Sequence, residues 1–303
     1  MASSSFAKGS FFAFLAFISW GLLPLYWNLL SAIDSLHILA FRMIFSLVFV
    51  GIILLAGRNY AWLEVFRDWK KAGNVILAGL LIGFNWGLYI WAVNSGRTIE
   101  ASLGYYINPL LTIVLGLLFF RERLRPMQWV AVSIALAGVL LMTLLSGRLP
   151  WVSLCLALSF GFYSVLKKTV ALSALESLGS ETLITLPMGL LLLCVNRGTE
   201  QGFLEFSGFQ GLSYLSALPV HTWVLLSLCG AATMFPLFLF AKGAKLLPLS
   251  TIGFMQFIAP TITFMIGLLV FKESFPTHYF AAFAFIWVAV ILYIISLRRD
   301  IIK

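Results

Sequence analysis

The sequence GYYINPLLTIVLGLLFFRE, residues 104–122, is an apolar segment of helix length with an Asn-Pro pair near its start and a charged end. A shift of 151 residues brings it onto MQFIAPTITFMIGLLVFKE, residues 255–273. Eight of the nineteen aligned positions are identical, among them Pro109 with Pro260, where so apolar a composition would give roughly two by chance. The chain therefore contains an internal duplication.

The composition places the chain in a lipid bilayer. Of its 303 residues, 61% are hydrophobic and 10% are charged, and the mean hydropathy is +1.02, whereas an ordinary soluble domain is about 25% charged. The basic residues behind the net charge of +9 lie in short loops between apolar runs, so we expect no nucleic-acid partner. The cysteines lack metal-ligand spacing, so neither a metal nor a cofactor is expected.

Ten apolar segments are long enough to cross roughly 30 Å of hydrocarbon. They lie near residues 9–30, 34–57, 72–94, 99–120, 125–147, 150–169, 177–196, 222–243, 249–271 and 275–298. With a cytoplasmic N-terminus, fifteen Lys and Arg residues fall on the inner side, Lys167 and Lys168 among them, and four on the outer side. This positive-inside bias predicts an all-α integral membrane protein of ten transmembrane helices with both termini cytoplasmic.

The duplication predicts how these helices are related. Each copy contains five helices, an odd number, so the second copy must enter the membrane in the opposite orientation. We predict a first repeat over residues 1–148 and a second, inverted repeat over 149–303. Inverted repeats are the construction of secondary transporters, whose two halves exchange conformations and open a midplane site to each side in turn.

Arg42 is the most informative single residue, because it lies about 12 Å into the second span. A guanidinium at that depth normally faces a water-filled space or a partner. We interpret it as an anchor for the carboxylate or other polar head of a substrate; the alternative is a structural ion pair or a side chain that reaches the interface. Glu181, about one turn into the seventh span, is its candidate counterpart as an ion-pair partner, a proton-coupling group or a substrate contact.

Polar and aromatic residues at helical spacing predict the lining of a substrate site. Asn85 and Tyr89 share one helix face, and Tyr105 and Asn108 share another. A polar side chain inside a span must face protein or a cavity, and for each of these residues a helix–helix hydrogen bond is the alternative. The predicted substrate-binding residues are Arg42, Asn85, Trp86, Tyr89, Tyr105, Asn108, Gln256 and, as a weaker candidate, Tyr163.

The prolines predict where helices bend. Pro109 and Pro260 occupy equivalent positions in the two copies, and each frees a backbone carbonyl inside a span. We interpret them as kinks that bend during gating, with static kinks that shape the bundle as the alternative.

The chain also resembles a known family. The Trp20-Gly21 pair, residues 100–129 and FAFIWVAVI at 283–291 resemble the EamA branch of the drug/metabolite transporter superfamily, and its RarD-type members most closely. The resemblance covers nearly the whole chain and implies a bacterial cytoplasmic (inner) membrane protein with a central cavity. It also implies movement of amino acids, metabolites or drugs, often outward. Phe41 stands where a histidine is usual in the family, which argues against a proton relay at that position.

The sequence thus predicts a secondary transporter, by preference an exporter, of a small polar or amphipathic organic solute such as an amino acid, metabolite or drug. Its expected partners are that small-molecule substrate and the lipid bilayer, with proton coupling through Glu181 as a candidate. A lipid or lipid-precursor flippase with the same inverted repeat is the alternative. Scattered histidines, without a nucleophile elbow or a phosphate-binding glycine loop, predict that the chain is not an enzyme.

Overall fold

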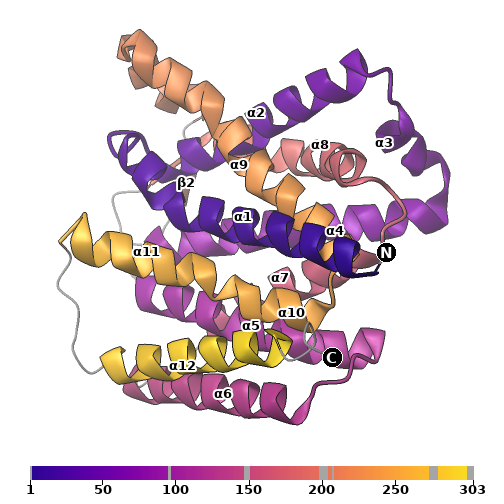
Figure 1. Ribbon diagram of the computed structural model, residues 1–303. Helices are drawn as coiled ribbons and strands as arrows, with labels where there is room; N and C mark the ends of the chain where they lie inside the picture. The colour runs from indigo at the N-terminus through magenta and orange to yellow at the C-terminus, as the bar shows by residue number, and fades with distance from the viewer. Residues whose placement is uncertain are drawn as a thin grey trace.

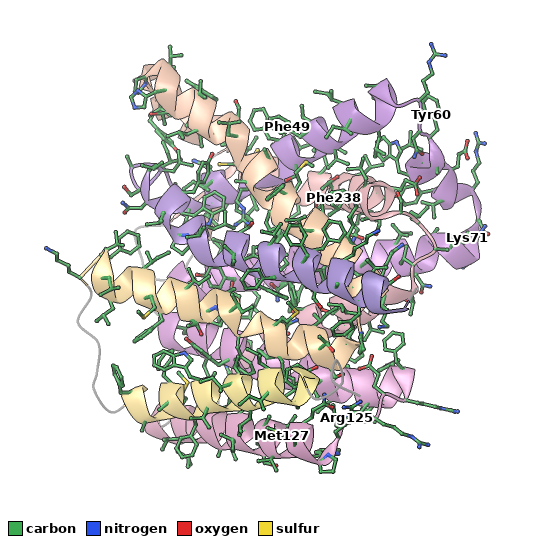
Figure 2. All side chains as sticks on the ribbon, viewed as in Figure 1. Phe49, Tyr60, Lys71, Arg125, Met127 and Phe238 are labelled. Carbon is green, nitrogen blue, oxygen red and sulfur yellow. The ribbon has the colours of Figure 1, made fainter. Side chains whose placement is uncertain are left out.

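The structure is a computed structural model that describes residues 2–94, 97–146, 151–197, 204–206, 208–272 and 279–298. Figure 1 shows a bundle of long helices, with the two ends of the chain at the same end of the bundle. Lys71 and Arg125 extend from that end as well (Figure 2). The predicted topology gives this arrangement, since an even number of spans returns the chain to the side on which it began.

The helices of the first half are α1 (Ala2–Asn28), α2 (Ser35–Ala56), α3 (Ala61–Glu64), α4 (Trp69–Asn94), α5 (Thr98–Phe120) and α6 (Pro126–Ser146), with the 3-10 turn η1 (Val65–Arg67) before α4. Those of the second half are α7 (Trp151–Thr169), α8 (Ala174–Leu192), α9 (Val220–Leu246), α10 (Leu249–Gln256), α11 (Ile258–Leu269) and α12 (Tyr279–Arg298). The connection from α8 to α9 holds the antiparallel strands β1 (Val195–Arg197) and β2 (Leu204–Phe206), with Val195 opposite Phe206, and the 3-10 helix η2 (Gly208–Ala217).

The helices match the predicted membrane segments. Within the described residues, seven helical spans are long and apolar enough to cross a membrane: they lie in α1, α2, α4, α5, α6, α9 and the α10–α11 pair. Helices α7, α8 and α12 occupy the sixth, seventh and tenth predicted positions. The fold class predicted from the sequence, an all-α integral membrane protein, is confirmed.

Helix packing follows the twofold pattern of the duplication. Each contact recurs when both helices are replaced by their counterparts in the other copy. The contact of α1 with α9 corresponds to that of α7 with α4, the contact of α5 with α7 to that of α11 with α1, and the contact of α2 with α9 to that of α8 with α4. The pairs α2 with α8, α5 with α10 and α6 with α12 map onto themselves. The positive φ angles of Arg121 (52°) and Lys272 (53°) also match, because both residues follow the last turn of equivalent helices. The repeat boundaries at 148 and 149 stay a prediction.

The two equivalent prolines have different effects on their helices. Helix α5 runs without a break through Pro109, whereas its counterpart is divided into α10 and α11 at Phe257. The break falls where Pro260 lacks the N–H that would bond to the carbonyl of Gln256. Bending of either helix during a transport cycle stays a prediction.

Candidate functional site

The guanidinium of Arg42, on α2, contacts two tryptophan rings from other helices. Its Cζ lies 4.7 Å from the ring centroid of Trp27 on α1 and 5.2 Å from that of Trp86 on α4. These are cation–π distances, and they offset part of the cost of holding a positive charge among membrane helices. The Arg42 Nε donates a 3.0 Å hydrogen bond to Oγ1 of Thr233 on α9, which joins the second half of the chain to the site.

The terminal nitrogens of Arg42 are available to a ligand. Within the described part of the chain, the Nε–Thr233 bond is the hydrogen bond found for this side chain. Neither Nη is among the fully buried, unpartnered polar atoms, and Arg42 is partly exposed. The two Nη groups, which carry four N–H donors, therefore face accessible space.

Two tyrosines extend the aromatic surface next to Arg42. The rings of Tyr89 on α4 and Tyr105 on α5 meet edge to face, with centroids 5.6 Å apart. Both side chains lie close enough to Arg42 to interact with its charge. Tyr105 is nevertheless 47% exposed, so accessible surface lies beside the guanidinium. We call Arg42, Trp27, Trp86, Tyr89, Tyr105 and Thr233 the Arg42 site.

Aromatic rings fill the bundle on one side of the Arg42 site. Trp20 of α1 packs on Phe160 of α7 (centroids 5.9 Å apart) and on Phe240 of α9 (5.5 Å). Phe17 and Tyr163 complete this aromatic plug around Phe240, and Phe240 and Tyr163 are fully buried. Along α1 the plug lies between Trp27 and the beginning of the chain, so it separates the Arg42 site from the end of the bundle that holds the termini.

A charged clamp closes that same end. Glu122, just past α5, accepts hydrogen bonds from the backbone N–H groups of Leu249 (2.6 Å) and Ser250 (2.9 Å) at the start of α10. Lys168, at the end of α7, pairs with Glu122 at 3.7 Å and donates to the Leu247 carbonyl. Leu247 also lies against Gly9 near the start of α1. This Glu122 clamp therefore ties both halves of the chain together, and its bonds show that α5 and α10 run antiparallel.

Gly116 makes room for the clamp. A Cβ at this position would lie 2.8 Å from Glu122 Oε2, closer than real Cβ contacts, and 3.0 Å from Cβ of Leu249, which is tighter than most. The left-handed turn at Arg121 folds the chain back so that the Glu122 amide bonds to the Gly116 carbonyl. The clamp thus explains, for the first copy, why Gly116, Arg121 and Glu122 are part of the repeated motif.

Glu181 pairs with Lys167 rather than with Arg42. Lys167 Nζ lies 2.8 Å from Glu181 Oε1 and donates to Ser177 Oγ at 2.9 Å. Ser177 and Tyr163 each donate to the Glu181 carboxylate, at 2.5 and 3.0 Å. All four side chains are buried. The structure thus pairs Glu181 with Lys167, which was counted among the inner-side basic residues and lies in the last turn of α7.

The packing of α2 against α8 explains why Glu181 lies far from Arg42. Helices α2 and α8 run antiparallel, because Gly189 lies against Met43 while Gly179 lies against Leu54. Arg42 is thus level with the end of α8, and Glu181 is level with the end of α2. The two contacts on α2, at Met43 and Leu54, are eleven residues or about 16 Å apart, so Arg42 and Glu181 lie at different levels of the bundle.

Of the other predicted lining residues, several lie in helix–helix contacts. Asn85 donates from Nδ2 to the Leu156 carbonyl and to Ser159 Oγ of α7, both at 2.9 Å. Thr112 donates to Gln256 Oε1 at 3.2 Å and lies 3.5 Å from Asn108 Oδ1, in a buried cluster between α5 and α10. The structure thus brings Arg42, Trp86, Tyr89 and Tyr105 together, and places Asn85, Asn108, Gln256 and Tyr163 in packed contacts elsewhere.

Sequence reasoning missed three residues that these arrangements use. Trp27 and Thr233 contact Arg42 from helices distant in sequence, and no local pattern identifies them. Lys167 could have been found: it follows Tyr163 by four residues, and Glu181 follows Ser177 by four. Such i,i+4 pairs each share a helix face, so two short polar faces on consecutive helices were visible in the sequence.

A helical bundle with twofold packing and a polar aromatic site between its halves defines a multi-pass membrane protein of the transporter kind. The chain matches the EamA-like transporter family over residues 7–144. It is 45% identical to the uncharacterized transporter YojE of Bacillus subtilis (95% of this chain and 94% of the relative). It is 41% identical to protein RarD of Streptomyces exfoliatus (94% and 87%) and 35% identical to protein RarD of Escherichia coli (95% and 94%).

The chain therefore belongs to the EamA-like transporter family. It is a membrane transporter whose relatives are bacterial proteins. A solved crystal structure has the same fold, with a TM-score of 0.70 over 97% of this chain and 98% of the other, at 18% sequence identity.

Proposed function

We propose that the protein is a secondary transporter that moves a small polar or amphipathic organic solute by alternating access between its two five-helix halves. The observation that carries this proposal is the Arg42 site, in which free guanidinium donors and aromatic surface face accessible space. An ionisable residue inside a membrane span suggests a functional site, and Arg42, unlike Lys167 and Glu181, has no ion-pair partner among the described residues. The site draws residues from both halves, as a site between exchanging repeats must.

The conformation supports a state that is closed toward the cytoplasm. The aromatic plug and the Glu122 clamp both lie between the Arg42 site and the end of the bundle that holds the chain termini. With both termini cytoplasmic, the Arg42 site opens to the outer side of a bacterial inner membrane. Export then requires the plug and the clamp to open so that solute can enter from the cytoplasm.

Glu181 is proposed as a structural group rather than a proton carrier in this state. Its carboxylate accepts hydrogen bonds from Lys167, Ser177 and Tyr163, and these three donors hold it between α7 and α8. Proton coupling through Glu181 would require this cluster to separate during the cycle.

A flippase remains the second candidate because of a groove between α4 and α8. The groove has a volume of about 450 Å³ and is apolar, and its lining includes Gly83, Phe84 and Met188. Phe84 is 53% exposed. However, Arg42, Tyr89 and Tyr105 are not among the groove residues, whereas a lipid headgroup and its acyl chain would need one continuous site. This separation favours a solute over a lipid.

The test is transport by purified protein in liposomes, with Arg42→Ala and Arg97→Ala as a matched pair. Arg97 also contacts two tryptophans, Trp91 and Trp151, each at 5.6 Å, but it lies outside the Arg42 site. We expect Arg42→Ala to abolish movement of amino-acid-like or drug-like solutes with membrane abundance unchanged, and Arg97→Ala to retain it. Folded wild-type protein that moves no such solute, or that scrambles labelled lipid instead, contradicts the proposal.

A further inference from the structure

We infer that the Arg42 site selects small organic anions, carboxylates above all, over cations and zwitterions. The inference rests on the transport function proposed above and narrows its substrate class. It follows from three properties of the site: its charge, the direction of its free donors, and the surface beside them.

The first property is a positive charge without a carboxylate partner. In the part of the chain that the structure describes, no acidic side chain forms an ion pair with Arg42. The groups that interact with its charge are Cys229, Tyr89 and Tyr105, which are ordinarily neutral near pH 7. An anion that enters the site neutralises a charge that water no longer fully solvates, whereas a cation would add a second charge of the same sign.

The second property is the orientation of the guanidinium. The bond from Nε to Thr233 and the ring contacts with Trp27 and Trp86 fix the plane of the group from three different helices. The donors left over are those on the two Nη atoms. A carboxylate can accept two parallel hydrogen bonds from an arginine, which an amide or a hydroxyl cannot reproduce.

The third property is what a zwitterion would find. An ammonium group seeks a carboxylate or an aromatic face. The described part of the site offers no carboxylate, and Arg42 itself already occupies the faces of Trp27 and Trp86. An ammonium on the tyrosine rings would lie beside the guanidinium, which repels it. The exposed surface of Tyr105, next to Tyr89, instead suits a flat apolar or aromatic body. The ligand class that fits is a small acid with such a body.

Four probes of one shape test the inference. They are 3-phenylpropanoate (anion), 3-phenylpropanamide (neutral), 3-phenylpropylamine (cation) and phenylalanine (zwitterion). Binding is measured by calorimetry and by thermal stabilisation of the purified full chain in lipid nanodiscs. For the wild type we expect the acid to bind about tenfold or more tightly than the amide, the amine and phenylalanine, because it alone makes the bidentate charged contact without a second charge.

Variants assign the preference to Arg42. Arg42→Gln should weaken binding of the acid by about ten- to hundredfold and leave binding of the amide nearly unchanged. Arg42→Lys should bind the acid with intermediate affinity, since an ammonium is a point charge without the planar fork of a guanidinium. Arg97→Ala should bind the acid like the wild type. If Arg42→Gln does not fold, the comparison of the acid with the amide on the wild type decides the question.

The outcomes separate this inference from the transport proposal. The anion preference is overturned if the amine, the amide or phenylalanine binds as tightly as the acid, or if binding of the acid does not depend on Arg42. It is also overturned if no probe binds. Movement of any of these probes in liposomes still supports transport. If the acid binds through Arg42 but is not moved, the anion site stands and the transport proposal fails.

Discussion

The buried cluster of Lys167 and Glu181 gives a prediction that the structure makes quantitative. Both side chains are buried, and they are joined at 2.8 Å with Ser177 and Tyr163 as further partners. Removing one member of a buried ion pair costs about 3–5 kcal/mol, because the other charge stays behind without compensation. Interhelical hydrogen bonds inside membranes are weaker, about 0.6 kcal/mol on average, so we expect the lower end, about 3 kcal/mol.

The experiment is a double-mutant cycle with Lys167→Met, Glu181→Gln and the double variant. Each single change should destabilise the protein by about 3 kcal/mol, roughly 150-fold in the unfolding equilibrium. The double variant leaves no buried charge, so its loss should be smaller than the sum of the single losses by at least about 2 kcal/mol. Unfolding of purified protein in mixed micelles with increasing denaturing detergent, followed by tryptophan fluorescence, gives these values.

The control is the surface pair Lys71–Asp68, which is joined at 3.2 Å but is 65% and 46% exposed. Lys71→Met should change stability by less than about 1 kcal/mol, because exposed pairs contribute little. Additive single effects in the Lys167–Glu181 cycle, or a Lys167→Met loss no larger than that of Lys71→Met, would refute the reasoning. If Glu181→Gln keeps full stability and removes only the pH dependence of transport, Glu181 is a coupling group instead.

Three further predictions concern packing, a helix cap and the clamp. Gly230→Ala should destabilise the protein by about 3 kcal/mol or more, because a Cβ there would lie 2.2 Å from the backbone carbon of Phe45. Gly51 has no atom within 4 Å of such a Cβ, so Gly51→Ala should leave stability unchanged or raise it by up to about 1 kcal/mol. The melting temperatures of the two variants test this difference. Glu176→Ala should cost about 1 kcal/mol by removing the capping box with Ser173 at the start of α8. Partial burial alone would raise the pKa of Glu176, but hydrogen bonds from Asn59 and Ser173 outweigh it and lower that pKa below 4.5. The stability that ionised Glu176 contributes is therefore present above pH 4.5 and is lost as the pH falls through the folded-state pKa. The difference in stability between wild type and Glu176→Ala, measured across pH 3–7, will show this loss. Glu122→Gln should weaken the charge-assisted bonds to Leu249 and Ser250 and raise the labelling of a cysteine placed at Phe240 from the cytoplasmic side, whereas Glu64→Gln, on α3, should not.

The positions of the helices were predictable because the bilayer sets them. The second span was predicted at 34–57 and the helix is Ser35–Ala56; the eighth was predicted at 222–243 and the helix is Val220–Leu246. A run of apolar residues long enough to cross hydrocarbon has to be helical, since no water is there to satisfy an open backbone. The duplication added the twofold packing, which no single segment reveals.

The partners of the charged residues were less predictable, because they depend on the level at which two helices meet. Arg42 was recognised as a cation inside a span, but Thr233, which accepts its hydrogen bond, is 191 residues away in the sequence. The level of Glu181 is set by the close contacts of Gly179 and Gly189 with α2, and small residues carry little information about register. Lys167 was counted only as a charge on the inner side, because topology rules count charges by segment and not by helix face.

If the two equivalent helices bend during alternating access, as proposed above, their different shapes at Pro109 and Pro260 affect the equilibrium between the two states of the empty protein. Two identical arms would make the outward-facing and inward-facing states mirror images of equal energy. Here one arm, α5, is a continuous rod, and the other is divided between α10 and α11, so bending either arm costs a different amount of free energy. The empty protein should therefore be open to one side of the membrane for most of the time. A solute on that side can bind at once, whereas a solute on the other side can bind only after the protein changes conformation.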